Sequence, residues 1–289
     1  MRPCACARAQ RGASVQRLLT HAPNAPPQRR EPFLASFLYS TVLAHGSLQA
    51  CVASFLAEKL SCPVLPATQL FQSFTAAYAA DASLVAACHA DLQAVVDRDP
   101  ACRNYIQCIL FFKGFQALQA HRLAHHLWTR DRKPLALGLQ SRVSERMQVD
   151  IHPGAVIGPG LMLDHATGVV IGETAVVGTN CSFLHKVTLG GTGVTAGDRH
   201  PKIGDGVLIG AGVSVLGPVR VGNGVKIGAG SVLLQDVPDR CTAVGVPARV
   251  IARPSEAPDA AGSSGDAEPA ILMDQMVSDD DSSHWAYII

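Results

Sequence analysis

The chain has 289 residues, and 24 Lys and Arg stand against 23 Asp and Glu, so its net charge is close to zero. This length is enough for two domains with buried cores. The balanced charge does not indicate a basic surface that would bind nucleic acid, and no apolar run is long enough to span a membrane. We therefore expect neither nucleic acid nor a membrane among its partners.

The first 30 residues contain six Arg and no acidic residue. An Arg-rich, acid-free N-terminus resembles a transit peptide, which predicts import into a plastid or mitochondrion. The alternative is a disordered leader that carries no targeting signal, in a cytoplasmic protein. Nine Cys include no CxxC pair, which favours free thiols in a reducing compartment.

Residues 31–148 are predicted to be helical, because Ala, Leu and Gln dominate and apolar residues recur at spacings of three and four. His121 and His125 fall on one helical face at a spacing that metal ligands use. No third ligand is evident, so we interpret them as packing or surface residues. Four prolines divide the region into about five to eight helices: Pro63, Pro66, Pro100 and Pro134.

Residues 151–238 repeat every six residues. This period fits neither a helix nor an alternating strand, but it is typical of a solenoid of hexapeptides. Gly directly follows eight of the apolar residues, and we expect it to supply the backbone angles of a tight corner. An apolar residue opens each of thirteen units: Ile151, Ile157, Leu163, Ile171, Val177, Phe183, Leu189, Ile203, Ile209, Val215, Val221, Ile227 and Leu233.

The repeat is interrupted twice. The step from Leu163 to Ile171 is eight residues, and the step from Leu189 to Ile203 is fourteen. Insertions in a solenoid fall at corners and often line its binding face. Each of these two breaks contains a His and an Asp.

Asp150 and His165 are fifteen residues apart, whereas one turn of three hexapeptides has about eighteen. We therefore expect the two residues near one edge of the coil, on neighbouring levels. A carboxylate that binds one imidazole nitrogen leaves the other free as a general base, with the nucleophile supplied by the substrate. The alternative is that both are ordinary corner residues that cap backbone amides.

Other candidate residues have a plain structural interpretation beside the functional one. Arg199 and His200 lie in the longer break, where a guanidinium can hold a carboxylate bidentately or simply be solvated. Asp99 precedes a proline, which predicts a helix N-cap. Lys202 and Lys226 can attract phosphate at the surface of the coil.

Residues 254–289 form an acidic, Ser- and Gly-rich segment that ends in HWAYII. A flexible tail has no folding need for a Trp, a Tyr and two Ile at its end. We expect these residues to dock into a partner protein, with docking onto the chain's own coil as the alternative.

These residues resemble the serine acetyltransferase family. The resemblance covers roughly residues 31–254 and the tail, and Val194 stands where the family usually has a Lys after GGTG. The matching motifs are RDPA (98–101), KGFQALQAHR (113–122), VDIHPGAVIG (149–158), LDHATGVVIGETAVVG (163–178), VTLGGTG (187–193), GDRHPKIGDGVLIGAG (197–212), KIGAGSV (226–232) and GVPARVI (245–251).

The resemblance implies an α + β fold, with an all-helical domain at 31–148 followed by a left-handed parallel β-helix at 149–253. It implies acetyl transfer from acetyl-CoA to the hydroxyl of L-serine, the first step of cysteine biosynthesis. It also implies a homotrimer or a dimer of trimers. Ile289 would enter the active site of O-acetylserine sulfhydrylase to form the cysteine synthase complex.

The family's site residues can be carried over by position. His165 would be the general base, and Asp150 would orient it. Asp99 and Asp164 would bind the substrate ammonium. No metal is implied. The remaining positions are Arg199 and His200 for the substrate carboxylate, and Gly191, Ala211 and Lys226 for the CoA groove.

Three other functions share some of these features. An acetyltransferase for another hydroxyl, such as a sugar, would share the coil. A zinc-bound coil of the carbonic anhydrase kind needs three surface His, two of them close in sequence. A regulatory subunit that binds the sulfhydrylase through its tail needs no catalysis.

Overall fold

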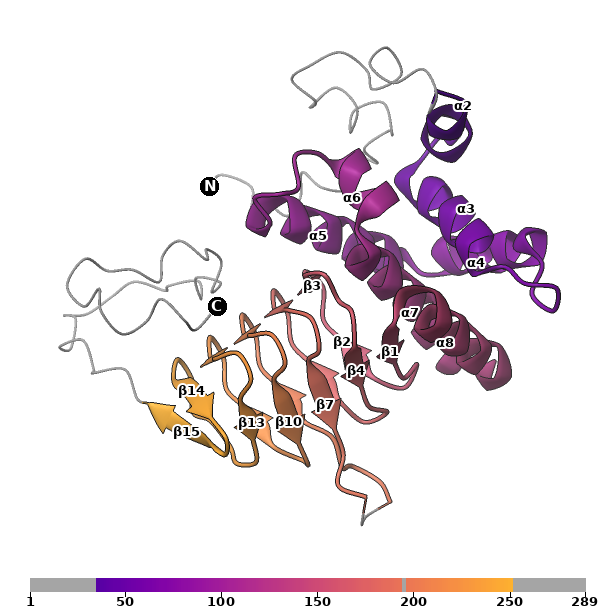
Figure 1. Cartoon of the computed structure of the whole chain (residues 1–289). Coiled ribbons are helices and arrows are strands. Elements are labelled where there is room, and N and C mark those ends of the chain that lie inside the picture. The colour runs from indigo at the N-terminus through magenta and orange to yellow at the C-terminus, as the bar shows by residue number, and fades with distance from the viewer. Residues whose placement is uncertain (1–34, 194–195, 252–289) are drawn as a thin grey trace, which may run out of the picture.

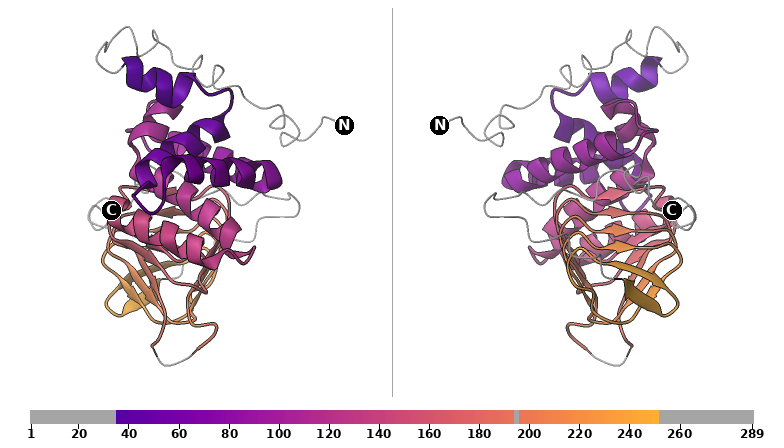
Figure 2. Two further views of the ribbon diagram at one scale, coloured as in Figure 1. Left: turned by 90° about the vertical axis from the view of Figure 1, so that its right-hand side faces the viewer. Right: turned by 90° about the vertical axis from the view of Figure 1, so that its left-hand side faces the viewer.

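The computed structural model describes residues 35–193 and 196–251. Helices occupy 35–147, and the short strands of a coil occupy 149–251 (Figure 1). The helical part covers one end of the coil (Figures 1 and 2). The predicted leader, the acidic tail with Ile289, and Val194 lie outside the described residues.

The predicted helical region is confirmed. Pro66 is the N-cap of α4, and Pro134 lies in the first turn of α8, so both prolines mark helix starts. Ser47 and Asn104 cap α3 and α6 by accepting backbone N–H bonds. The helical segments are α2 (Ala35–Leu38), the π-helix η4 (Tyr39–Leu43), α3 (Leu48–Leu60), α4 (Ala67–Ala80), α5 (Ala82–Arg98), α6 (Tyr105–Phe111), α7 (Lys113–Trp128) and α8 (Lys133–Met147).

The predicted hexapeptide coil is also confirmed, as three sheets that form the faces of a prism and are parallel except where β15 pairs antiparallel with β14. One sheet has the order β1-β4-β7-β10-β13, one β11-β8-β5-β2, and one β15-β14-β12-β9-β6-β3. The strands are β1 (Val149–Ile151), β2 (Val156–Ile157), β3 (Met162–Leu163), β4 (Val169–Ile171), β5 (Val176–Val177), β6 (Ser182–Phe183), β7 (Thr188–Gly190), β8 (Lys202–Ile203), β9 (Leu208–Ile209), β10 (Ser214–Leu216), β11 (Arg220–Val221), β12 (Lys226–Ile227), β13 (Val232–Leu233), β14 (Thr242–Gly245) and β15 (Ala248–Ile251).

The apolar residue of every repeat lies inside the prism, and each of the thirteen is at most 9% exposed. The role predicted for the glycines that follow them is wrong. None of these glycines has a positive φ. A Cβ on Gly158 would lie 2.6 Å from the carbonyl oxygen of Gly178, so glycine permits the close approach of successive turns there. The left-handed angle comes two residues later, as at Gly160 (φ 80°).

A buried ion pair joins the helices to the coil. The Arg122 guanidinium on α7 binds the Asp91 carboxylate of α5 at 2.6 and 2.7 Å and donates to the carbonyls of Ile157 and Gly158. Asp91 also accepts from the Gly160 N–H at 2.9 Å. Breaking a buried pair of this kind costs about 3–5 kcal/mol. The pair therefore fixes α5 and α7 against the first turn of the coil.

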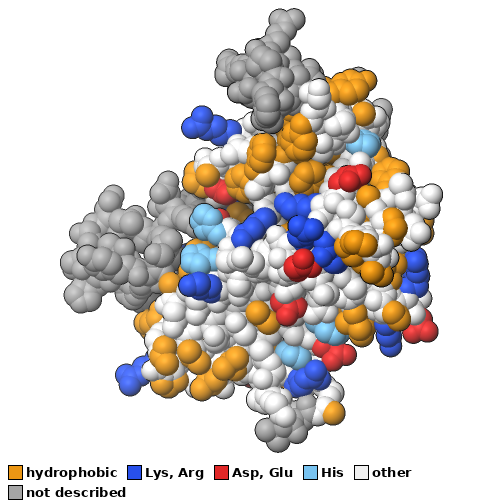
Figure 3. Space-filling view, turned by 45° about the vertical axis from the view of Figure 1, so that its right-hand side comes forward, with side chains coloured by type: hydrophobic (Ala, Val, Ile, Leu, Met, Phe, Trp, Pro, Cys, Tyr) orange, Lys and Arg blue, Asp and Glu red, His pale blue; other side chains and the backbone are white. Residues whose placement is uncertain are grey.

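Basic and acidic side chains lie interspersed on the face shown in Figure 3, in line with the balanced composition. No helix in the described part of the chain has the length and apolarity that crossing a membrane requires. The seven Cys of the described ranges are all free thiols.

Candidate active site

The corner between β3 and β4 carries the predicted general base. We call this the His165 corner and define it by Asp164, His165 and Ala166, with His185 one turn further along the coil. The φ angles of His165 and Ala166 are 55° and 58°, in the left-handed region that residues other than Gly seldom adopt. Two such residues in succession store strain, which is typical of functional sites. The His165 side chain is 74% exposed.

Two side chains flank His165. The Asp164 carboxylate lies 3.7 Å from its Nε2, and the His185 ring meets it edge to face at 5.9 Å between centroids. His185 was not among the predicted site residues. The sequence contained a signal for His185, because the repeat places it at the next corner along the edge that carries His165. Its Nδ1 is buried and has no hydrogen-bond partner.

The predicted ammonium ligands Asp99 and Asp164 lie close enough to interact. Burial raises the pKa of Asp164, the His165 charge opposes that rise, and the negative charge of Asp99 adds to it. Two carboxylates in partial burial attract a cation, since a positive charge relieves both desolvation and mutual repulsion. This pair can therefore bind an ammonium group beside His165.

The helix N-cap predicted for Asp99 is wrong. Asp99 follows the last residue of α5, and its carboxylate accepts from the Ala101 N–H at 2.8 Å in a tight turn. The next helix, α6, begins six residues later with Asn104 as its cap. A proline after an Asp suits this turn as well as a helix start, so the local sequence did not distinguish them.

Arg98 holds this turn in place. Its Nη1 donates to the carbonyl oxygens of Gly160, Asn180 and Cys181 and to the Ser182 hydroxyl, at 3.0–3.2 Å. Arg98 is buried, and it is the residue directly before Asp99. The first residue of the RDPA motif is therefore a positioning residue for the second.

The other two predicted binding residues lie at a different corner. We call this the His200 corner and define it by His152, Glu173, Thr174, Arg199 and His200. The Thr174 N–H donates to His200 Nδ1 at 3.2 Å, and burial lowers the pKa of this imidazole. The neutral ring therefore carries its proton on Nε2. That nitrogen would lie 3.0 Å from a Cβ on Gly191, so it is a fixed donor beside the glycine loop.

Arg199 adds a guanidinium to the same corner. Its Nη2 binds the Glu173 carboxylate at 3.1 Å, and its Nη1 donates to the Gly197 carbonyl oxygen. The backbone N–H groups of Arg199 and His200 both donate to the Thr174 hydroxyl. A guanidinium and an imidazole N–H side by side are groups that can bind a carboxylate.

Asp150 does not meet His165 within this chain, contrary to the expectation from their spacing. Asp150 accepts from Gln140 Nε2 at 2.7 Å, and its charge acts on His152. The first turn of the coil is 20 residues long, because Val149 pairs with Val169. Asp150 therefore pairs with Val170, the middle residue of β4, five residues beyond His165. The two extra residues at the His165 corner cause this offset.

The residues predicted for the CoA groove are likewise divided between the His200 corner and the edge that carries His165. Gly191 lies at the His200 corner. Ala211 follows His185 along the His165 edge, and the neighbouring Gly212 N–H donates to the His185 carbonyl. Lys226 belongs to β12, between Leu208 and Thr242 on the sheet that leads into this edge. Among the described residues, no group of three or more His, Cys, Asp or Glu is arranged to hold a metal ion.

The single chain thus presents two half-sites on two edges of one sheet. The His165 corner offers an exposed imidazole and two carboxylates, which suit a proton transfer and an ammonium group. The His200 corner offers a guanidinium and an imidazole N–H, which suit a carboxylate. Together they match an amino acid with a hydroxyl side chain.

Comparison with known proteins points to one family. The family described as "Serine acetyltransferase, N-terminal" matches residues 18–120, and "Bacterial transferase hexapeptide (six repeats)" matches 200–235. A probable serine acetyltransferase of Oryza sativa subsp. japonica is 63% identical to this chain where the two match. The match covers 77% of this chain and 66% of the relative's length.

Two further relatives are covered more fully. A chloroplastic serine acetyltransferase of Arabidopsis thaliana is 57% identical over 77% of this chain and 71% of its own length. A solved structure of a soybean serine acetyltransferase complexed with serine has 54% identity and a TM-score of 0.79, over 82% of this chain and 97% of that one. From its helical domain, its hexapeptide coil and these likenesses, the chain belongs to the serine acetyltransferase family.

Proposed function

We propose that this protein transfers the acetyl group of acetyl-CoA to the hydroxyl of L-serine, giving O-acetylserine and CoA, as the first step of cysteine biosynthesis. The observation that carries the proposal is the pair of half-sites described above. Together they offer a base, an ammonium site and a carboxylate site, which are the three groups that serine requires.

In this mechanism the unprotonated imidazole of His165 takes the proton from the serine hydroxyl as the oxygen attacks the thioester carbonyl of acetyl-CoA. The carbon–sulfur bond then breaks, CoA leaves as the thiolate, and this thiolate takes the proton that His165 removed from serine. Asp99 and Asp164 hold the ammonium group, so the hydroxyl is directed toward His165. Arg199 and His200 hold the carboxylate, and Gly191, Ala211 and Lys226 line the groove for CoA.

We further propose that the site is completed between copies of this chain in a homotrimer. The two corners flank the sheet of β1, β4, β7, β10 and β13, so they point away from each other. A contact between two different surfaces closes into a ring when the rotation fits, and three prisms meet at 120°. The His165 corner of one copy then faces the His200 corner and Asp150 of the next. This arrangement pairs His165 with an orienting carboxylate that its own chain does not provide.

The function is tested by CoA release from acetyl-CoA with purified protein. We expect release with L-serine and none with N-acetylglucosamine or galactose, and adding L-cysteine in a parallel series measures inhibition. Equal rates with the sugars would show a different acceptor. Stoichiometric zinc in active protein would favour the metal-bound alternative.

The shared site is tested by mixing two impaired variants, His165→Ala and Arg199→Ala, and assaying them at a serine concentration well below the raised KM of Arg199→Ala. If each site uses corners from two copies, mixed trimers contain sites with both corners intact, about a quarter of the total for random mixing. Activity should therefore return on co-expression. If each chain holds a complete site, co-expression gives no recovery.

Two proposals concern residues outside the described ranges. We propose that residues 1–30 direct import into a plastid or a mitochondrion, supported by their Arg-rich composition and by relatives named chloroplastic and mitochondrial. The mature N-terminus from cells tests this, since a cytoplasmic protein would keep these residues. We also propose that the tail binds O-acetylserine sulfhydrylase through Ile289. Deleting the last four residues should abolish this binding and leave acetyl transfer unchanged.

A further inference from the structure

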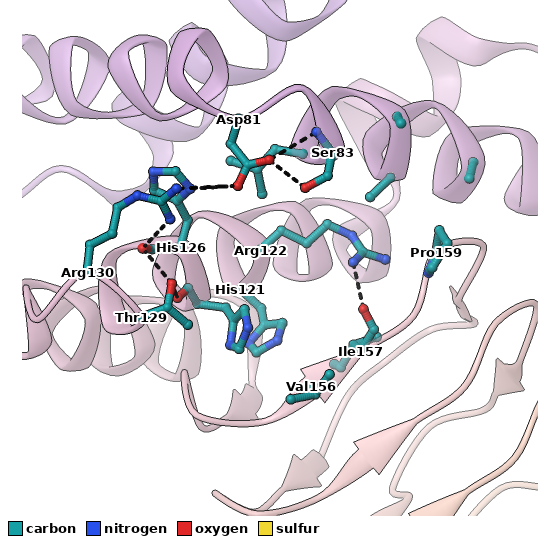
Figure 4. Close-up of a pocket in the computed structure, with 15 residues that line it drawn as sticks. Asp81, Ser83, His121, Arg122, His126, Thr129, Arg130, Val156, Ile157 and Pro159 are labelled. Carbon is teal, nitrogen blue, oxygen red and sulfur yellow. Dashed lines mark hydrogen bonds and ion pairs between the residues drawn. The ribbon is translucent and has the colours of Figure 1, made fainter.

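Helix α7 contacts the first turn of the coil at two separate places along its length. In its second half, Arg122 donates to the carbonyl oxygen of Ile157 at 3.0 Å (Figure 4). At its N-terminal end, the helix begins with Lys113 beside the His165 corner. The same helix therefore ties both the start of the coil and the corner that carries the proposed base to the helical domain.

The first turn of α7 touches the His165 corner on both sides. Lys113 Nζ donates to the hydroxyl of Thr167, the residue directly after the corner. A Cβ on Gly114 would lie 2.0 Å from the carbonyl oxygen of Leu163, the residue directly before the corner. Glycine is therefore required for the backbone of α7 to approach so closely. The first two residues of the motif KGFQALQAHR thus contact the two residues that enclose the corner.

The corner depends on its neighbours for its shape, because its backbone is strained and its base is exposed. His165 and Ala166 both have positive φ, a conformation that persists only where the surrounding structure imposes it. The exposed His165 side chain contributes little packing of its own. Thr167 fixes the backbone here, since its N–H donates to the His165 carbonyl oxygen and its own carbonyl accepts from the Lys186 N–H, both at 2.8 Å. A side chain that holds Thr167 therefore also holds the backbone of the base.

We propose that Lys113 is a positioning residue for acetyl transfer, which fixes the backbone of His165 through its bond to Thr167. The bond is charge-assisted, and such bonds are stronger than those between neutral groups. The helix that supplies it is itself fixed by the buried pair of Arg122 and Asp91. The catalytic consequence rests on the proposed function, because positioning matters only if His165 is the base. The hold on the corner does not rest on it.

A double-mutant cycle tests this role with Lys113→Met, Thr167→Val and the double variant. Each single change removes one partner of the bond and nearly preserves the size of the side chain. We expect each to lower kcat about 10- to 100-fold, since misplacing a reacting group by about 1 Å has an effect of this order. The double variant should be no slower than either single one, because both remove the same bond. Losses that multiply in the double variant would overturn the proposal.

Two further variants separate the bond from the charge of the lysine. Lys59 is also half-buried, and its Nζ binds the Gln116 side chain at 2.5 Å, one helical turn along α7 from Lys113. Lys59→Met therefore removes a neighbouring charge and leaves the bond to Thr167, so kcat should stay near the wild-type value. Lys113→Arg keeps a charged donor and should recover most of the activity. Equal losses in Lys59→Met and Lys113→Met would assign the effect to charge and refute the positioning role.

Hydrogen–deuterium exchange gives a measurement that does not depend on activity. Lys113→Met should speed the exchange of the peptide that contains residues 164–168, whereas Lys59→Met should not. Unchanged exchange in Lys113→Met, or faster exchange with a normal kcat, would overturn the proposal. Urea unfolding checks that each variant is folded. If the wild-type protein releases no CoA with serine, the proposed function fails instead, and the exchange measurement still decides whether Lys113 holds the corner.

Discussion

The two half-sites are built in opposite ways. At the His165 corner the base is largely exposed, its backbone is strained, and it has two weak neighbours at 3.7 and 5.9 Å. At the His200 corner each functional group is held by its own chain, through Thr174, Glu173 and Gly197. A group that exchanges a proton with a substrate needs access, and groups that recognise a carboxylate need fixed geometry. The difference between the corners fits the division of work that we propose for them.

The largest effect is expected from His165→Gln. Loss of a general base lowers kcat by about 10²–10⁴-fold. Because the His165 side chain is exposed, the free energy of unfolding should change little. Steady-state kinetics and urea unfolding measure the two quantities, with His89→Gln on α5 as the matched control. Near-normal turnover in His165→Gln would assign the proton transfer to another group.

Arg199→Ala tests recognition at the other corner. Removing a charge-assisted hydrogen bond to a carboxylate should raise the KM for serine about 10- to 100-fold. Arg220→Ala removes an exposed guanidinium from the same coil and should leave this KM unchanged. An Arg199→Ala enzyme with normal KM and reduced kcat would mean that the guanidinium acts on the transition state and not on serine binding.

Gly172→Ala tests the rigidity of the His200 corner. A Cβ on Gly172 would lie 1.9 Å from His200 Nε2, so the imidazole must shift. Overpacking of this kind costs about 1–3 kcal/mol, and we also expect a several-fold rise in the KM for serine. Gly46→Ala is the control, because nothing lies within 4 Å of its added Cβ. Unchanged stability and KM would show that the corner is softer than its contacts indicate.

The smallest effect is a pH dependence at the His165 corner. Burial raises the pKa of Asp164 in the folded protein, so the folded state holds this proton more tightly than the unfolded state. The wild-type free energy of unfolding should therefore fall as the pH rises from about 3.8 through that raised pKa. Asp164→Asn removes this titration. Urea unfolding of both proteins at several pH values measures the difference, and parallel curves would contradict the shift.

The fold was largely predictable, because the six-residue period is a local property that burial then enforces. The repeat placed all thirteen apolar residues inside the prism. The roles of Gly158 and Asp99 were predicted wrongly for a common reason. A glycine that makes room for the next turn, and an Asp that closes a tight turn, have the same local sequences as a glycine with positive φ and a helix cap.

The sequence by itself determined the coil, the two breaks in it and the residue types that those breaks carry. Only the tertiary structure decided which of these residues meet. The place of a residue around the coil depends on all the insertions that come before it in the chain. Because the first turn has 20 residues, Asp150 lies further from His165 around the coil than a turn of regular length would place it. Likewise, no local pattern could place Arg98 against the Asn180 carbonyl or Asp91 against Arg122, because those contacts arise when separate elements pack.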